Sequence, residues 1–222
     1  MFDFLEGYDL LGAFWVTVQL TLYSALFSFV WGTMLAAMRV SPVPLMRGFG
    51  AAYVNIVRNT PLTVIIVFCA LCLADIYGVT FGAGDDVKTQ YFRLAVFGLS
   101  AYTAAFVCEA LRSGINTVPL GQAEAARALG LTFTQVMTSI VLPQAFRSVV
   151  GPLANVLIAL TKNTTVAAAI GVAEAALLMK EMIENEAALI PITAVFAFGF
   201  ICLTMPTGLL LGWLSKRVGV KR

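Results

Sequence analysis

The stretch GQAEAARALGLTFTQVMTSIVLPQAFR, Gly121 to Arg147, is rich in alanine, glutamine and threonine and contains three charged residues. It lies in a chain of 222 residues of which 60% are hydrophobic and only 12% are charged. That composition is outside the range of soluble domains and is typical of an integral membrane protein. A polar, helix-prone stretch in such a chain indicates a part that stands outside the membrane, where another molecule can contact it.

Long runs without charge mark the membrane spans, because a helix needs roughly 20 apolar residues to cross about 30 Å of hydrocarbon. Leu10 to Met38 and Ala187 to Ser215 contain no charged residue, and three further apolar stretches lie between them. We therefore predict an all-α integral membrane protein of one domain with about five transmembrane helices. The predicted spans are residues 10–38, 53–75, 92–113, 148–172 and 190–214, and residues 114–147 form a loop outside the membrane.

The distribution of lysine and arginine predicts the orientation, since these residues are retained on the cytoplasmic side of short loops. With the N-terminus outside, ten basic residues are cytoplasmic, three are external, and Lys162 lies within a span. The cytoplasmic ones are Arg39, Arg47, Arg58, Arg112, Arg127, Arg147, Lys216, Arg217, Lys221 and Arg222, and the external ones are Lys88, Arg93 and Lys180. We predict a multi-pass protein with an external N-terminus, a cytoplasmic C-terminus and a cytoplasmic 114–147 loop.

Several classes of chemistry are excluded by residue content. The chain has no histidine, which removes the usual general base and the commonest metal ligand. It has no G-x-x-x-x-G-K-[ST] sequence to cradle a phosphate. Cys69 and Cys72 form a C-x-x-C pair in an apolar span without companion ligands, an arrangement typical of packing. We predict no catalytic, cofactor or metal site in this chain, so active transport would draw its energy from a partner or an ion gradient.

The polar stretch itself predicts two short helices. Residues 120–129 are good helix formers, and Gly130 is suited to the left-handed conformation that ends a helix. Thr132 and Gln135 have the spacing of a capping box that opens a second helix, and Pro143 is expected to bound it. Two short helices joined at a glycine would make a compact knob that a partner can grip.

The motif in this knob is specific. Glu124, Ala125 and Ala126, then Gly130, then Ile140, Leu142 and Pro143 follow the pattern E-A-A-x3-G-x9-I-x-L-P. The pattern resembles the signature of permease subunits of type I ABC importers. The stretches RNTPLT (58–63), GINTVPLGQ (114–122) and LTKNTTVAAAIGVAE (160–174) are similar to the polar amino-acid branch of that family, most of all to its glutamate-type members. The resemblance extends from about residue 11 to residue 213.

The resemblance implies a non-catalytic subunit of the bacterial plasma membrane with the type I ABC importer transmembrane fold. Its expected partners are separate ATP-binding subunits, which hold ATP and Mg²⁺, an extracytoplasmic amino-acid-binding protein, and a second permease, identical or homologous. The lipid bilayer surrounds it, and no nucleic acid is expected. The 114–147 loop would be the coupling loop that seats on an ATP-binding subunit.

The residues of the motif suit such an interface. Ala125 and Ala126 are small enough for close approach, Glu124 offers a carboxylate, and Gly130 permits a tight reversal. The alternative is that Glu124 only pairs locally with Arg127 at i+3, which is worth a few tenths of a kcal/mol.

Polar residues within the spans are candidates for a substrate pathway. Lys162 lies alone in an apolar span, and a lysine there must face protein or water. Asn155 and Thr165 share its helix face, and Asn163 follows it. The alternatives are snorkelling or a structural ion pair. Glu109 is the obvious partner, but it should lie about 10 Å or more closer to the cytoplasm, so direct pairing within one subunit is not expected.

Pro61 should kink the second span, and Thr60 and Thr63 beside it could offer polar groups to the same pathway. Transporter sites are commonly lined by interrupted helices near the middle of the bilayer. The alternative is a kink with a purely structural role.

The substrate is a further inference. Where the family often reads K-D-T-S, this chain reads Lys162, Asn163, Thr164, Thr165, so a lysine remains without the carboxylate. A net positive pathway favours an anionic amino acid such as glutamate. Two rival functions stay open at this point: an ion-coupled secondary transporter or channel that uses Lys162 and Glu109, and a membrane scaffold that transports nothing.

Overall fold

The computed structural model describes residues 7–82 and 86–218, so Lys221 and Arg222 of the orientation argument lie outside the described residues. Every regular element in these two ranges is helical, which confirms the all-α prediction. The elements are α1 (Leu10–Val40), α2 (Pro44–Arg58), α3 (Leu62–Val67), η2 (Phe68–Ile76), α4 (Val87–Ile115), α5 (Leu120–Ala128), α6 (Phe133–Val136), η3 (Met137–Val141), α7 (Leu142–Asn163), η4 (Thr164–Ile170), α8 (Ala175–Glu186) and α9 (Leu189–Val218). Of these, η2 and η3 are π-helical and η4 is a 3₁₀-helix.

Four helical stretches of the described chain are long and apolar enough to cross a membrane. They are Leu10–Val40, Val87–Ile115, Phe133–Ile170 and Leu189–Arg217. The remaining expected crossing, the second along the chain at 53–75, corresponds to a pair of helical segments. These are Pro44–Arg58 and Leu62–Ile76, with an angle of 103° between them. The second crossing therefore has a sharp break where we expected a kink.

The chemistry around Pro61 explains this break. Proline has no N–H, and it disfavours helical conformation in the residue before it. The end of α2 is instead closed by side chains, since Asn59 Nδ2 donates to the carbonyl of Asn55 (2.6 Å) and Thr60 Oγ1 donates to that of Ile56 (2.9 Å). Because the end of α2 is closed by these side chains, α2 and α3 need not share an axis.

Pro143 does not end a helix, contrary to our expectation. The helix that begins at Phe133 continues through η3 and α7 to Ile170. Pro143 is the second residue of α7, directly after η3. A π-helical turn shifts the backbone hydrogen bonds by one residue, which accommodates a proline that cannot donate one. The last part of the loop predicted at 114–147 therefore belongs to the same continuous helix as the residues of the candidate span that follow it.

The core of the bundle is the contact between α1 and α4. Small and hydroxyl side chains on α1 are buried at spacings of three or four residues, as in other membrane helix pairs. Gly32 marks the closest approach, because a Cβ at this position would lie 2.6 Å from Cβ of Val107. Serine and threonine hydroxyls in this seam bond to backbone carbonyls, as Thr21 does to Thr17 (2.9 Å).

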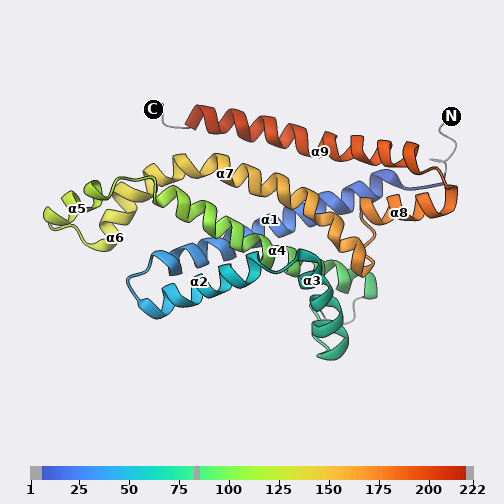
Figure 1. The fold of residues 1–222 in the computed structure, drawn as a ribbon, viewed down its shortest axis with the longest axis horizontal. Helices are drawn as coiled ribbons and strands as arrows, with labels where there is room; N and C mark the ends of the chain where they lie inside the picture. Colours follow the sequence, from blue (N-terminus) through green and yellow to red (C-terminus); the bar gives the residue numbers. More distant parts are fainter. Residues whose placement is uncertain (1–6, 83–85, 219–222) are drawn as a thin grey trace.

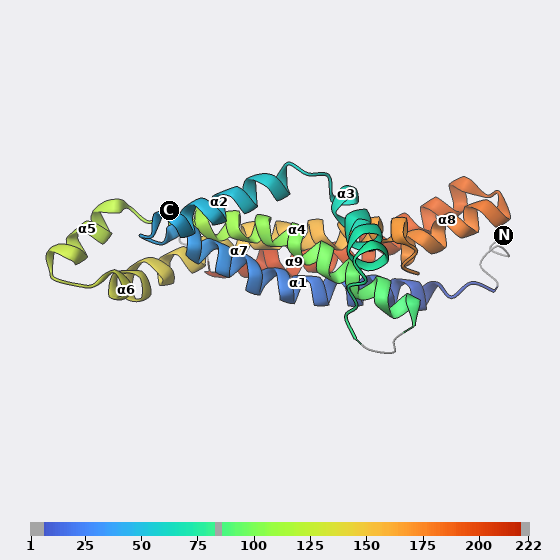
Figure 2. The same ribbon diagram turned by 90° about the horizontal axis from the view of Figure 1, so that it is seen from below.

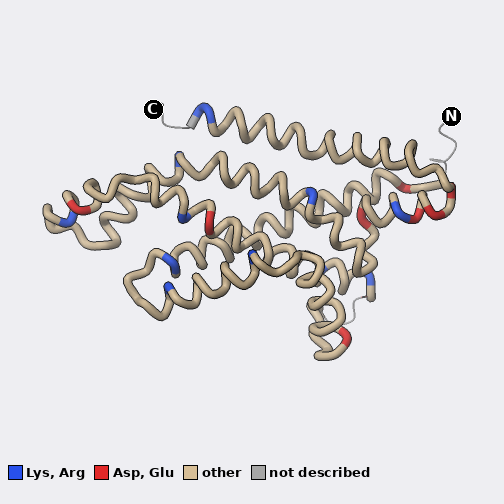
Figure 3. Tube along the Cα trace, viewed as in Figure 1, with Lys and Arg blue, Asp and Glu red and all other residues tan. Residues whose placement is uncertain are grey.

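The long helices run side by side, whereas α3 projects sideways from the bundle (Figures 1 and 2). Residues 120–141, which form α5, α6 and η3 and are called the knob below, project at one end. At the other end lies α8, a helix that our sequence analysis did not predict. Acidic residues gather around α8, whereas basic residues gather at the end with the knob (Figure 3).

Candidate functional site

The knob has the local structure that its sequence predicts. The helix expected at 120–129 is α5, which runs from Leu120 to Ala128. Gly130 follows with φ +85°, the left-handed conformation that L-residues rarely adopt. Thr132 and Gln135 form the predicted capping box at the start of α6.

The exposed face of α5 carries only part of the motif. Glu124 and Ala125 are exposed, whereas Ala126 is buried. Ala126 belongs to a small hydrophobic core that holds the knob together, with Val118, Val136, Val141 and Ala145. The assignment of Ala126 to a contact surface is thus wrong, since its small side chain lets α5 pack against η3 and α7.

Two leucines that our sequence reasoning missed stand at the ends of α5. Leu120 is 80% exposed and Leu129 is 85% exposed, on either side of Glu124. Their signal was available in the sequence as two apolar residues that flank a polar helix. The local pair considered for Glu124 and Arg127 is not formed, and Glu124 has no ion-pair or hydrogen-bond partner in residues 7–82 and 86–218.

The knob is tied to α7 by side-chain hydrogen bonds. Gln144 of α7 donates to Oε1 of Gln122 on α5 (2.6 Å), and Thr117 donates to Ser148 of α7 (3.0 Å). Because α7 is continuous with α6 and η3, a force on α5 reaches the membrane helix through both its backbone and these side chains.

Two of the predicted pathway residues meet in a cavity of about 300 Å³ between α4 and α7. Asn155 and Asn163 line it from α7. Tyr102, Thr103 and Phe106 line it from α4. Among the described residues, Thr103 Oγ1 stands out as a buried side-chain oxygen with no hydrogen-bond partner, although the residue is only 3% exposed.

The other predicted pathway residues do not line this cavity. Lys162 is exposed, and its ammonium contacts no acceptor among the described residues. Thr165 donates to the carbonyl of Lys162 (2.8 Å). Thr60 caps the end of α2, and Thr63 is exposed at the start of α3.

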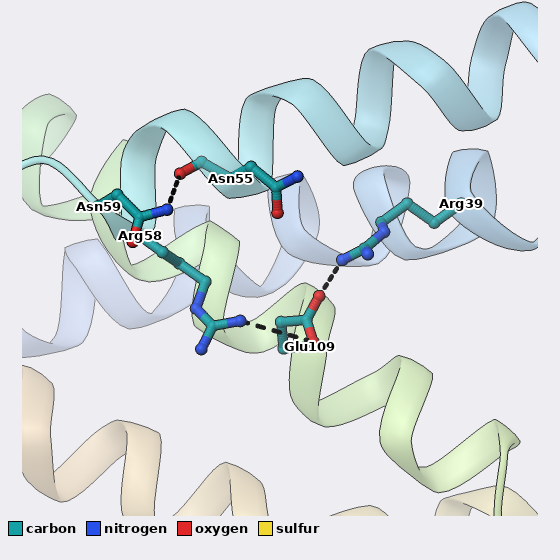
Figure 4. A network of polar contacts seen from close by, with 5 residues as sticks. All are labelled: Arg39, Asn55, Arg58, Asn59 and Glu109. Carbon is teal, nitrogen blue, oxygen red and sulfur yellow. Dashed lines mark hydrogen bonds and ion pairs between the residues drawn. The ribbon is translucent and has the colours of Figure 1, made fainter.

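Glu109 lies between two arginines that sequence reasoning did not assign to a site (Figure 4). Arg39, at the end of α1, donates a hydrogen bond to Oε1 of Glu109. Arg58, at the end of α2, places its guanidinium 3.6 Å from the other carboxylate oxygen. Glu109 thus joins α4 to both arms of the α1–α2 hairpin and does not pair with Lys162, in agreement with our expectation.

A further carboxylate, Glu174, is fully buried at the start of α8. Its Oε1 accepts hydrogen bonds from the backbone N–H groups of Ala176 (2.9 Å) and Leu177 (3.0 Å). Its other oxygen accepts one from Thr17 of α1 (3.4 Å). Burial raises the pKa of Glu174 above its ordinary value of 4.5, against the opposing effect of these hydrogen bonds.

We expect this carboxyl group to make the protein less stable as the pH rises. Between pH 4.5 and the raised pKa, the folded state holds a proton that the unfolded state has released, so raising the pH through this range disfavours folding. Glu174→Gln keeps an acceptor for the N–H groups and cannot ionise. The unfolding temperature in detergent should therefore fall less with pH in Glu174→Gln than in the wild type. Glu181→Gln, an exposed change on the same helix, serves as the control, and equal slopes in all three proteins would contradict the assignment.

Comparison with known proteins agrees with this architecture. The family described as "Binding-protein-dependent transport system inner membrane component" matches residues 10–220. The chain is 57% identical to the Glutamate transport system permease protein GluC of Corynebacterium efficiens, over 97% of this chain and 96% of the relative. It is 55% identical to the protein of the same name from Corynebacterium glutamicum, with the same coverage.

A solved structure shows the same fold. The crystal structure of an amino acid ABC transporter with histidines superposes with a TM-score of 0.83 at 24% identity, over 94% of this chain and 93% of that one. The family and the fold together argue against the two rival functions, an ion-coupled transporter or channel and a scaffold that transports nothing. The chain belongs to the family of binding-protein-dependent transport system inner membrane components, the non-catalytic permease subunits of type I ABC importers.

Proposed function

We propose that this chain is the permease subunit of an ATP-driven importer of glutamate. The observation that carries the substrate is the identity of 55–57% over nearly the full length with two glutamate permease proteins. The charges of the chain support it, because two arginines, Arg39 and Arg58, share the single carboxylate of Glu109, and Lys162 pairs with no acidic group among the described residues. An excess of positive charge favours an anionic amino acid over a neutral one.

The knob supports a role in energy coupling. On α5, outside the predicted spans, the exposed surface includes Glu124 and Ala125 and, at the two ends of the helix, Leu120 and Leu129. We propose that this surface seats on a separate ATP-binding subunit, which holds ATP and Mg²⁺. The pattern of basic residues supports a cytoplasmic knob and C-terminus and an external N-terminus.

The opposite end of the molecule would receive substrate from an extracytoplasmic binding protein. A second permease, identical or homologous, would complete the pathway, because five crossings are too few to enclose one. The cavity lined by Asn155 and Asn163 is a candidate part of that pathway on this chain's side. Lys162, Thr165, Thr60 and Thr63 do not line it and would serve at other stages of passage.

The test is a competition assay in proteoliposomes that contain this chain, a second permease and the ATP-binding subunit, with the binding protein added outside. Labelled glutamate should accumulate, and unlabelled glutamate should compete better than glutamine, arginine or histidine. Preferential competition by arginine or histidine would overturn the assignment of an anionic substrate.

A further inference from the structure

Arg39 and Arg58 share a single carboxylate, and they share it unequally. Arg39 is hydrogen-bonded to Glu109, and its side chain is only 12% exposed. Arg58 is 3.6 Å from Glu109, which is beyond hydrogen-bond contact, and its side chain is 44% exposed. The carboxylate therefore compensates Arg39 first, and the three groups together keep one net positive charge.

The guanidinium of Arg58 also has its donors free. An arginine carries five N–H donors and stays protonated at any physiological pH. In residues 7–82 and 86–218, the guanidinium of Arg58 makes its ion pair with Glu109 and a contact with an aromatic ring, and no hydrogen bond. It can therefore donate two parallel hydrogen bonds to a second carboxylate.

The aromatic ring places Arg58 beside the cavity between α4 and α7. The guanidinium carbon lies 5.6 Å from the ring centroid of Phe106, and Phe106 lines the cavity. Phe106 and Glu109 are neighbours on α4 at i and i+3, so Arg58 spans from the ion pair to the cavity wall. A guanidinium stacked on a ring keeps its edge available for hydrogen bonds in its own plane.

The cavity offers polar groups to the rest of a small ligand. Its volume of about 300 Å³ is at the lower end of the range for small-molecule sites. Thr103 lines the cavity from α4, but its Oγ1 is buried in the wall without a hydrogen-bond partner among the described residues, so only a rotation about its Cα–Cβ bond would present it to a ligand. Asn155 and Asn163 line the cavity from α7, and their side-chain amides can both donate and accept hydrogen bonds.

We propose that Arg58 is a selectivity residue that binds the side-chain carboxylate of the passing amino acid, while Arg39 keeps Glu109 in place. Arrival of the substrate then exchanges the weak ion pair of Arg58 with Glu109 for a bidentate pair with the substrate. A neutral side chain cannot make this exchange, so the step discriminates by charge within the permease, in addition to any selection by the binding protein. The inference rests on the proposed import of glutamate.

The test measures binding to the permease and ATP-binding subunits in nanodiscs without the binding protein. Labelled glutamate is the probe, and unlabelled glutamine is the competitor. Arg58→Gln should weaken glutamate binding by about tenfold or more, the loss expected for a charge-assisted hydrogen bond, and leave the affinity for glutamine unchanged. Arg58→Lys keeps the charge but loses the planar, five-donor guanidinium. Its glutamate affinity should lie between those of the wild type and Arg58→Gln.

Arg47→Gln is the matched control, since it removes an exposed arginine from the same helix, α2, that neither pairs with Glu109 nor lines the cavity. It should leave the ratio of glutamate to glutamine affinity unchanged. Three results would overturn the proposal. Arg58→Gln could lose affinity for glutamate and glutamine equally, or the control variant could show the same ratio of glutamate to glutamine affinity as Arg58→Gln. The third is that the wild type shows no saturable glutamate binding. If the wild-type complex with its binding protein fails to import glutamate at all, the proposed function itself is wrong.

Discussion

Replacing Glu124 with lysine is expected to reduce substrate uptake by about tenfold or more and to release the ATP-binding subunit. Glu124 is exposed at the centre of α5 and has no partner among the described residues, so its carboxylate is available to a basic or donor group of another chain. Loss of a charged pair at an interface costs about 2–5 kcal/mol, and a lysine adds repulsion. Co-purification of the ATP-binding subunit with the tagged permease measures the association directly.

The control for this variant is Thr134→Lys, which places the same lysine on the exposed side of α6. It should leave association and uptake near their wild-type values, and both variants should reach the membrane at equal levels because neither side chain is buried. Wild-type uptake by Glu124→Lys at equal expression would contradict the role of α5 in coupling.

Replacing Glu109 with glutamine should destabilise the protein more than any exposed substitution. The change leaves the guanidinium of Arg39, which is largely buried, without its counter-charge. Removing one partner of a buried ion pair costs about 3–5 kcal/mol, and the partial exposure of Glu109 favours the lower figure. We expect the unfolding temperature in detergent to fall by roughly 6–12 °C.

A double variant separates loss of the ion pair from a loss of packing. Adding Arg39→Gln to Glu109→Gln removes the uncompensated charge, so the double variant should be more stable than Glu109→Gln alone. A double variant that is less stable than Glu109→Gln would show that the residues act independently.

The knob could be predicted from sequence because its determinants are local. Helix-forming residues before Gly130, a left-handed glycine and a threonine three residues before a glutamine each act on their own few neighbours. The sequence could not show that Ala126 faces inward, since this depends on where η3 and α7 pack.

The features that were missed depend on contacts between distant segments or on unusual backbone. Glu109 finds Arg39 and Arg58 only because α2 folds back along α1 and α4, which places residues 70 and 51 positions apart together. The π-helical segment η3 lets a helix pass through Pro143, which local rules would end there. Pro61, a residue of the same type, instead separates two helices at 103°, because side chains close the end of α2.

The most direct test of the account is the energy source of uptake. Proteoliposomes with the assembled complex and its binding protein would be loaded with ATP and Mg²⁺, and the entry of labelled glutamate would be followed. The account predicts uptake that requires ATP hydrolysis inside and glutamate-loaded binding protein outside, and that is unaffected by collapsing proton and sodium gradients. Uptake by this chain alone, driven by an ion gradient without ATP, would contradict it.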